Sequence, residues 1–196
     1  MPSMSLFSPH QSKKINMKIL TKNNINTQGY WNTHQTALDF GLRQKKYLEL
    51  AGKGEKIVEL GCGLSPMLTF ADNFATKIGV DFSQETIKEA NEAYKNVLYV
   101  LSDVIYTPFP NESFDAVVAG EVIEHIEDPK MLIEEMDRIC KRNGIMIIST
   151  PHLEFTDPEH LWEFDEQDFN EIGWETETVQ SDRFKGRSYI FAWKRK

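Results

Sequence analysis

A short apolar run that breaks at two glycines constrains the fold of this chain more than any other stretch. Residues 56–63 read KIVELGCG, so the run ends abruptly at Gly61 and Gly63. This is typical of a buried parallel strand that turns tightly before a helix, and glycines let the backbone approach a ligand closely. Because burial of an unpaired charge costs several kcal/mol, Glu59 inside the run should have a polar partner. We therefore expect a small ligand with hydrogen-bond donors at this loop.

Strand-like and helix-like segments alternate along the rest of the chain. A helix is expected over residues 30–51, and further helices begin near Ser65, Ser83, Asp128 and Asp165. This alternation predicts a doubly wound α/β fold with a mostly parallel sheet, in which ligands bind outside the carboxyl ends of the strands. The expected strands are residues 57–60, 77–82, 97–104, 114–119 and 145–149, followed by two runs that can form a hairpin, 175–180 and 188–193.

The length and local composition indicate how the chain is organised. A chain of 196 residues suits one domain with a sizeable core. Residues 1–26 are rich in Ser, Asn, Lys and Gln and lack a sustained period. We therefore expect a disordered tail over residues 1–26 and a single domain over residues 27–196.

Charge and cysteine content argue against several classes of protein. The net charge of −8 argues against extended nucleic-acid binding, although an acidic balance also keeps a protein in solution. No stretch of about 18 apolar residues is present to span a membrane, and residues 1–17 lack the apolar core of a signal peptide. Cys62 and Cys140 give neither a disulfide framework nor a metal-ligand spacing. We expect a cytoplasmic protein without a membrane partner, and its oligomeric state is not indicated.

Acidic residues at the next two strand ends suit a nucleoside. Asp81 lies 20 positions after Gly61, an offset at which a carboxylate accepts hydrogen bonds from both ribose hydroxyls. Phe82 can cover an adenine face, with a place in the core as its alternative. Asp103 can accept a hydrogen bond from an adenine amino group. Capping of a following helix is the alternative role for both carboxylates.

The loop departs from the dinucleotide-binding pattern at one position. That pattern has a third glycine where this chain has Pro66. Proline removes a backbone donor that a pyrophosphate would use, and Glu59 adds negative charge nearby. A cationic ligand without phosphate therefore suits the loop better.

Six motifs follow one another from the glycine loop to the fifth expected strand. They are ELGCG at 59–63, VD at 80–81, SD at 102–103, FDAVV at 114–118, GEVIEH at 120–125 and NGIMIISTP at 143–151. In order and spacing they resemble the class I S-adenosylmethionine-dependent methyltransferases over roughly residues 30–196. The resemblance implies a Rossmann-like sheet of seven strands with a terminal antiparallel hairpin.

The resemblance also implies roles for individual residues. The backbone of the glycine loop would contact the methionine part of S-adenosylmethionine, with Glu59 beside its cationic group. Asp81 would bind the ribose, Asp103 would lie near the adenine, and Tyr30 or Trp31 would cover the cofactor. The expected cofactor-binding residues are Tyr30, Glu59, Gly61, Cys62, Gly63, Asp81, Phe82, Ser102, Asp103, Val104, Gly120 and Glu121.

Histidines are the natural candidates for a catalytic base. In methyl transfer from a sulfonium, the enzyme mainly orients the acceptor and removes its proton, and histidine titrates near neutral pH. His125, His152 and His160 all lie in loops expected at the strand ends. A structural hydrogen bond is the alternative for each. Of the three, His125, flanked by two glutamates, and His160 are predicted to be catalytic.

These observations predict methyl transfer to a hydroxyl or amine of a small metabolite. Ubiquinone-pathway and sugar- or natural-product-modifying enzymes are the nearest comparisons by loop pattern. The acceptor pocket would come from the N-terminal segment and residues 150–174. Aromatic residues there predict a partly apolar pocket, with core packing as the alternative: Phe155, Trp162, Phe164 and Trp174.

Two other functions are kept as alternatives. Glu121, Glu124, His125 and His160 resemble the metal-binding set of small-RNA 3′-terminal 2′-O-methyltransferases, and such ligands can hold a divalent ion. The acidic balance and the lack of a separate RNA-binding domain argue against that function. The other alternative is a non-catalytic module that binds S-adenosylmethionine. Basic residues near the C-terminus suit either RNA or a solvated edge strand: Arg183, Lys185, Arg187, Lys194, Arg195 and Lys196.

Overall fold

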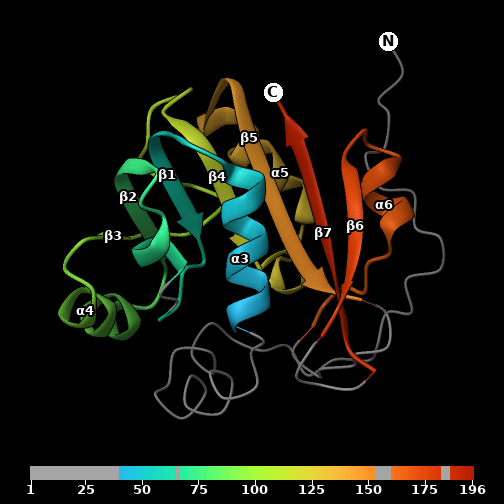
Figure 1. Ribbon diagram of the computed structural model, residues 1–196, viewed down its shortest axis with the longest axis horizontal. Coiled ribbons are helices and arrows are strands. Elements are labelled where there is room, and N and C mark those ends of the chain that lie inside the picture. Colours follow the sequence, from blue (N-terminus) through green and yellow to red (C-terminus); the bar gives the residue numbers. More distant parts are fainter. Residues whose placement is uncertain (1–39, 65–66, 153–159, 182–185) are drawn as a thin grey trace.

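The computed structural model describes residues 40–64, 67–152, 160–181 and 186–196 (Figure 1). The expected tail, Tyr30, the first part of the expected N-terminal helix, Pro66, and Phe155 lie outside these ranges. The helices are α3 (Phe40–Ala51), η1 (Met67–Phe70), α4 (Gln84–Ala93), η2 (Ile123–His125), α5 (Pro129–Ile139) and α6 (Glu166–Asn170). The strands are β1 (Gly54–Leu60), β2 (Phe74–Asp81), β3 (Leu98–Leu101), β4 (Phe114–Gly120), β5 (Cys140–Pro151), β6 (Glu175–Gln180) and β7 (Ser188–Arg195).

The strands form one seven-stranded sheet in the order β3-β2-β1-β4-β5-β7-β6. The first five strands run parallel, and β7 is antiparallel to both β5 and β6. The expected fold class, a mostly parallel sheet with a terminal antiparallel hairpin, is confirmed. The chain leaves β1 toward β2 on one side and later returns to place β4 on the other side. This reversal of strand order puts the carboxyl ends of β1 and β4 at the position where such sheets bind ligands.

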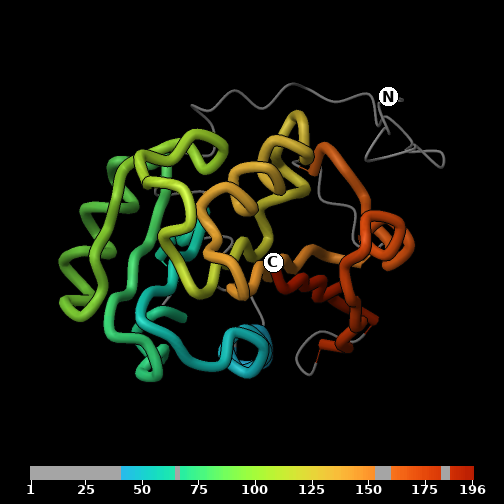
Figure 2. The backbone as a smooth tube through the Cα atoms, turned by 90° about the horizontal axis from the view of Figure 1, so that it is seen from above, coloured from blue at the N-terminus to red at the C-terminus, as the bar shows by residue number. Residues whose placement is uncertain are grey.

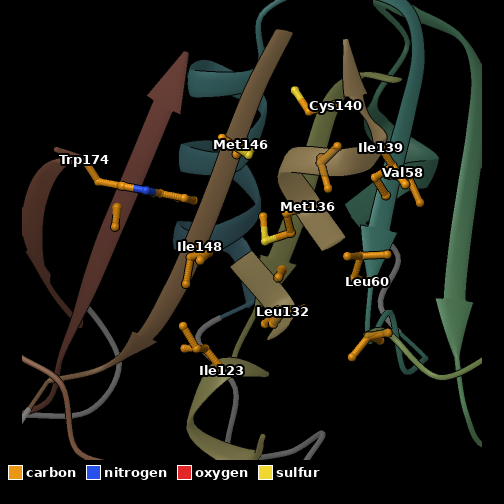
Figure 3. Packing of buried hydrophobic residues seen from close by; sticks show 14 of the residues in the cluster. Val58, Leu60, Ile123, Leu132, Met136, Ile139, Cys140, Met146, Ile148 and Trp174 are labelled. Carbon is orange, nitrogen blue, oxygen red and sulfur yellow. The ribbon is translucent and has the colours of Figure 1, made fainter. Parts of the chain in front are cut away.

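Helices cover both faces of the sheet, and each face has its own core. Successive strand residues point to opposite faces, so Val58 packs in the core under α5 while Ile57 packs in the core under α3. Figure 2 shows α3 and α5 on opposite sides of the sheet. Figure 3 shows the α5 side, where Leu132 and Met136 lie beside Leu60, Ile123 and Ile148. Fully buried apolar residues on both faces hold the strand ends in place.

Three segments differ from the sequence-based expectation. A helix was expected from Ser65, but its described part is only the short 3-10 helix η1. β3 ends at Leu101 rather than at residue 104, because Asp103 Oδ1 accepts a hydrogen bond from Ile105 N and the chain turns away from the sheet. β5 begins at Cys140, directly after α5, and Asn143 adopts a left-handed φ of 65° within it. The expected turn at Asn143 is therefore an irregularity inside a longer strand.

Candidate active site

The loop after β1 can be made only with glycine at its first position. Gly61 has a φ of 70°, and a Cβ atom there would lie 2.4 Å from Cγ2 of Val122. Gly63 also has a positive φ, of 51°. Between them, Cys62 N donates to Val80 O over 2.9 Å, which joins the loop to β2. The loop therefore packs closely against the segment after β4, and there is no room for a side chain at position 61.

Asp81 connects the glycine loop to the start of α4. Its Oδ2 accepts a hydrogen bond from Gly63 N at 3.0 Å, and its Oδ1 accepts one from Ser83 N at 2.9 Å. Burial raises the pKa of Asp81, although the backbone donors of Ser83, Gly63 and Phe82 favour the charged form. The side chain that caps α4 is Ser83, which accepts from Thr86 N. The alternative in which Asp81 is itself the helix cap is therefore wrong.

The surroundings of this loop favour a positively charged ligand. Glu59 and Asp81 are buried at the ends of adjacent strands, with 4 % and 2 % of their surfaces exposed. Burial raises the pKa of the Cys62 thiol well above its usual value, and Asp81 and Glu59 raise it further. Cys62 is therefore a neutral group rather than a nucleophile. A cation bound here would be attracted by both carboxylates.

The segment after β3 lies beside Asp81, as expected for the adenine end of a nucleoside site. Ser102 N donates to Asp81 O over 3.0 Å, which brings the two strand ends together. Asp103 starts a turn in which Ser102 Oγ donates to Tyr106 O, and no helix follows it among the described residues. Val104 is buried in the core of the α5 face. Asp103 is thus held in a turn next to the ribose-binding candidate.

The residues after β4 contact α3 rather than the glycine loop through their polar groups. A Cβ atom on Gly120 would lie 2.2 Å from the hydroxyl oxygen of Tyr47. Glu121 has a φ of 56°, and its Oε1 accepts a hydrogen bond from Ser149 Oγ at 2.6 Å. Its Oε2 lies 3.3 Å from the guanidinium of Arg43. The Glu121 carboxylate, expected to bind the cofactor, is therefore engaged by α3 and β5.

Arg43 is a candidate site residue that the sequence analysis missed. Its side chain comes from α3, is 6 % exposed, and lies over the ring of Tyr189 at 5.1 Å from the centroid. Its Nε has no hydrogen-bond partner within the described part of the chain. Burial opposes its charge, but Glu121 and nearby groups outweigh this and raise the pKa of Arg43. The sequence signal was the spacing of Arg43 and Tyr47, which are four residues apart on one helix face.

His125 and His160 come together with Glu124, whereas His152 does not join them. The rings of His125 and His160 lie 4.9 Å apart at 76°. One ligand atom from each histidine and one from Glu124 lie within 4.8 Å of one another. His152 instead contacts Ser188 through Nδ1 at 3.3 Å. The structure therefore groups the two predicted catalytic histidines with one of the two flanking glutamates.

Glu124 is a buried carboxylate with one oxygen left over. Oε2 accepts from Thr150 Oγ1 at 3.1 Å, but Oε1 has no hydrogen-bond partner among the described residues. Burial raises the pKa of Glu124 well above its usual value, and Glu121 raises it further. The backbone fixes this cluster, because Leu161 N donates to Glu124 O over 2.7 Å. An orphaned buried oxygen beside two imidazoles fits the ligand set of a divalent ion.

Other expected contributors have mainly structural roles. Phe164 and Trp174 are buried in the core, which favours the core alternative for these two. Trp162 is half-buried and is held by a hydrogen bond from Nε1 to Ile126 O, at 2.9 Å. The ammonium groups of Lys194 and Lys196 donate hydrogen bonds to the carbonyl oxygens of Ile172 and Asp137, so each has a partner within the protein. Arg183 and Lys185 lie outside the described residues.

No helix in the described part of the chain has the length and hydropathy to cross a membrane.

Comparisons with known proteins agree with this geometry. Residues 58–148 match a family model described as a methyltransferase domain. The chain is 31% identical over 105 residues to a ubiquinone biosynthesis O-methyltransferase of Pelagibacter ubique, covering 50% of this chain and 42% of that protein. It is 27% identical over 128 residues to a probable S-adenosylmethionine-dependent methyltransferase of Mycolicibacterium smegmatis, covering 64% and 47%. The chain thus spans about half the length of the curated relatives that it matches.

A solved structure shows the same fold. Geranyl diphosphate C-methyltransferase from Streptomyces coelicolor, in complex with Mg²⁺, geranyl diphosphate and S-adenosyl-L-homocysteine, superposes with a TM-score of 0.64. The two chains are 14% identical, and the match covers 79% of this chain and 76% of the other. At this identity the likeness concerns the fold alone.

Proposed function

Because this chain belongs to the class I S-adenosylmethionine-dependent methyltransferases, we propose that it transfers a methyl group from S-adenosylmethionine to a hydroxyl or amine of a small metabolite. One observation carries the proposal. At the reversal of strand order, Asp81 closes the glycine loop through Gly63 and leaves carboxylate lone pairs for a ribose. The two buried thiols, Cys62 and Cys140, support a reducing, cytoplasmic setting.

The cofactor would lie across the carboxyl ends of β1, β2 and β4. Asp81 accepts hydrogen bonds from the ribose, Asp103 lies toward the adenine amino group, and Phe82 covers the ring. The glycine loop and Glu59 surround the cationic sulfonium and amino groups of the methionine part. Arg43 supplies a positive charge opposite the carboxylate of the methionine part of the cofactor. Tyr30, outside the described residues, remains the proposed cover.

Transfer needs an oriented acceptor and a base. When bound, the cofactor would supply an electrophilic methyl group with a thioether as leaving group, and the site would hold the acceptor oxygen or nitrogen in line with the carbon–sulfur bond. The acceptor's proton passes to His125 or His160, which lie together at the same end of the sheet. The Glu124 carboxyl next to them stabilises the imidazolium when it is ionised.

A second candidate function rests on the cluster of Glu124, His125 and His160. A divalent ion held by these residues would use the orphaned Oε1 of Glu124. When bound, such an ion binds acceptor hydroxyls and lowers their pKa. The cluster supports metal-dependent 2′-O-methylation of an RNA 3′ end as the second candidate.

Ligand binding and methyl transfer test these proposals together. We expect S-adenosylhomocysteine to bind the wild-type chain in a calorimetric titration and Asp81→Ala to lose this binding. Asp72→Ala, which removes an exposed carboxylate that pairs with Lys77, is the control and should bind as wild type. The absence of binding at millimolar ligand would overturn the cofactor assignment.

A labelled-methyl screen across metabolite and RNA pools, with and without chelator, separates the functions. Transfer to a metabolite that persists in chelator supports the first proposal. Transfer to RNA that chelator abolishes supports the second. Cofactor binding without transfer to either pool would indicate a non-catalytic binding module.

A further inference from the structure

A chain of buried polar groups leads from α3 to the end of β4. The hydroxyl of Tyr47 lies 2.5 Å from Ser149 Oγ, which lies 2.6 Å from Glu121 Oε1, and Glu121 Oε2 lies 3.3 Å from Arg43. These four residues come from α3, β5 and the loop after β4, and they contribute to none of the helix caps that the structure describes. We call them the Arg43 relay.

The direction of the hydrogen bonds in the Arg43 relay follows from the chemistry of its members. A carboxylate only accepts, so the single proton of the Ser149 hydroxyl goes to Glu121. Tyr47 must then donate to Ser149. Burial raises the pKa of Tyr47 far above its usual value, so its hydroxyl keeps the proton that it donates. Edge contact with Phe191, at 5.3 Å between ring centroids, fixes the Tyr47 ring.

The backbone of Glu121 requires these contacts. A residue other than glycine with a φ of 56° costs about 1 kcal/mol or more and persists only where its surroundings hold it. Ser149 and Arg43 each hold one carboxylate oxygen of Glu121. Arg43 therefore contacts a carboxylate in a fixed position, while its own Nε has no hydrogen-bond partner among the described residues.

The distribution of charge at the site indicates which group of the cofactor Arg43 binds. Glu59, Asp81 and Glu124 are buried acidic groups at the same end of the sheet. The proposed cofactor carries a carboxylate of its own, which these groups repel. Among the described residues, Arg43 is the one arginine or lysine whose side chain is buried, and it has an unused donor. It is therefore the group that can offset the charge of the cofactor carboxylate.

We propose that Tyr47, Ser149 and Glu121 are positioning residues that hold the Arg43 guanidinium against the carboxylate of the bound cofactor. They act through Arg43 and do not touch the cofactor, so Glu121 contributes to cofactor binding only indirectly. The inference rests on the proposed function, and it makes the amino-acid end of the cofactor the part whose recognition depends on α3.

The test compares two ligands that differ in the amino-acid end. S-adenosylhomocysteine carries the carboxylate, whereas 5′-methylthioadenosine keeps the nucleoside and thioether but lacks the carboxylate. We expect Ser149→Ala and Tyr47→Phe each to weaken S-adenosylhomocysteine binding about tenfold and to leave 5′-methylthioadenosine binding unchanged. Arg43→Gln should remove the preference for S-adenosylhomocysteine, and Arg43→Lys should restore part of it.

Control variants and contrary outcomes make the test decisive. Ser113→Ala removes a serine hydroxyl that donates to Pro110 O at the other end of β4, and it should bind both ligands as wild type does. If Ser149→Ala and Tyr47→Phe lose affinity equally for both ligands, the Arg43 relay has only a structural role. Unchanged S-adenosylhomocysteine affinity in these variants, or in Arg43→Gln, would also overturn the inference.

Failure of the proposed function has a different signature, because then neither ligand binds the wild-type chain. Tyr47→Phe deletes a single oxygen and keeps the ring packed on Phe191. It therefore carries the test if Ser149→Ala does not fold.

Discussion

Glu135 shows how a single buried carboxylate stabilises this protein away from the site. Its Oε1 accepts from Thr107 N at 2.7 Å, and its Oε2 accepts from Arg138 Nε at 2.7 Å. Burial raises the pKa of Glu135, but the hydrogen bonds from Arg138 and Thr107 outweigh this and hold the pKa below the usual value of 4.5. The loop after β3 is thereby fastened to α5.

Replacing Glu135 should therefore have a pH-dependent effect. A depressed pKa means that the folded state favours the ionised form, so its stabilisation is present above about pH 4.5 and is lost as the pH falls through the lower folded pKa. We expect Glu135→Gln to lower the free energy of unfolding by about 2 kcal/mol at pH 7 and by less at pH 3. Urea denaturation at both values measures this. An equal loss at the two pH values would contradict the assignment.

At the scale of single residues, the sequence predicts groups that lie close to a recognisable local pattern. Asp81 and the glycine loop belong to one strand–turn–helix unit, so their spacing carries the signal. Arg43 and Glu121 are far apart in the sequence and meet only because α3 packs across the ends of β4 and β5. No local sequence pattern indicates such a long-range contact. His125 and His160 could be named as candidates by chemistry, but their approach depends on the segment after β5.

Helix caps determine where the short elements begin. α6 has only five residues, yet it packs against the edge strand β6. Its start is fixed by a capping box, in which Asp165 Oδ1 accepts from Asp168 N and Asp168 Oδ2 accepts from Asp165 N. This reciprocal pair of hydrogen bonds gives partners to two backbone N–H groups that have no intrahelical acceptor in the first turn.

Loss of this cap should loosen the edge of the sheet. We expect Asp165→Ala to lower the free energy of unfolding by about 1 kcal/mol and to speed hydrogen exchange of the β6 amides. Glu163→Ala, at an exposed position two residues earlier, should change neither quantity. Exchange that accelerates equally in β1 would show a global effect rather than a local one.

Among the elements, the sequence predicts best where hydrophobic period and turn residues agree. The bounds of β6 match the expected residues 175–180, and α5 begins at Pro129 with Asp128 as its N-cap, as expected. The sequence predicted a strand that continued to residue 104, because Val104 continues the apolar run. The side chains of Ser102 and Asp103 satisfy the local backbone in a turn instead, a competition that periodicity does not represent.

The molecule as a whole is two cores that share one sheet. Trp174 lies in the core on the α5 face, and Trp193 packs against the core on the α3 face. Because adjacent residues of the same strands belong to opposite cores, loss of strand pairing disrupts both cores together.

This arrangement predicts cooperative loss of both cores. We expect Met136→Ala, on the α5 face, and Phe191→Ala, on the α3 face, each to lower the free energy of unfolding by about 2–5 kcal/mol. Each variant should still unfold in one transition by circular dichroism and by tryptophan fluorescence. Separate transitions for the two signals would show that the cores unfold independently.

The position of β7 between β5 and β6 bears on how the chain is made. Among the described strands, β6 pairs with β7 alone, so it leaves the ribosome before its partner has been synthesised. Until residues 188–195 emerge, β5 also presents an open edge, and open edges are where nascent chains pair wrongly with one another. Among the described strands, translation therefore delivers last the strand that joins β5 to β6. The interval before β7 emerges is when the growing polypeptide most needs protection from its neighbours.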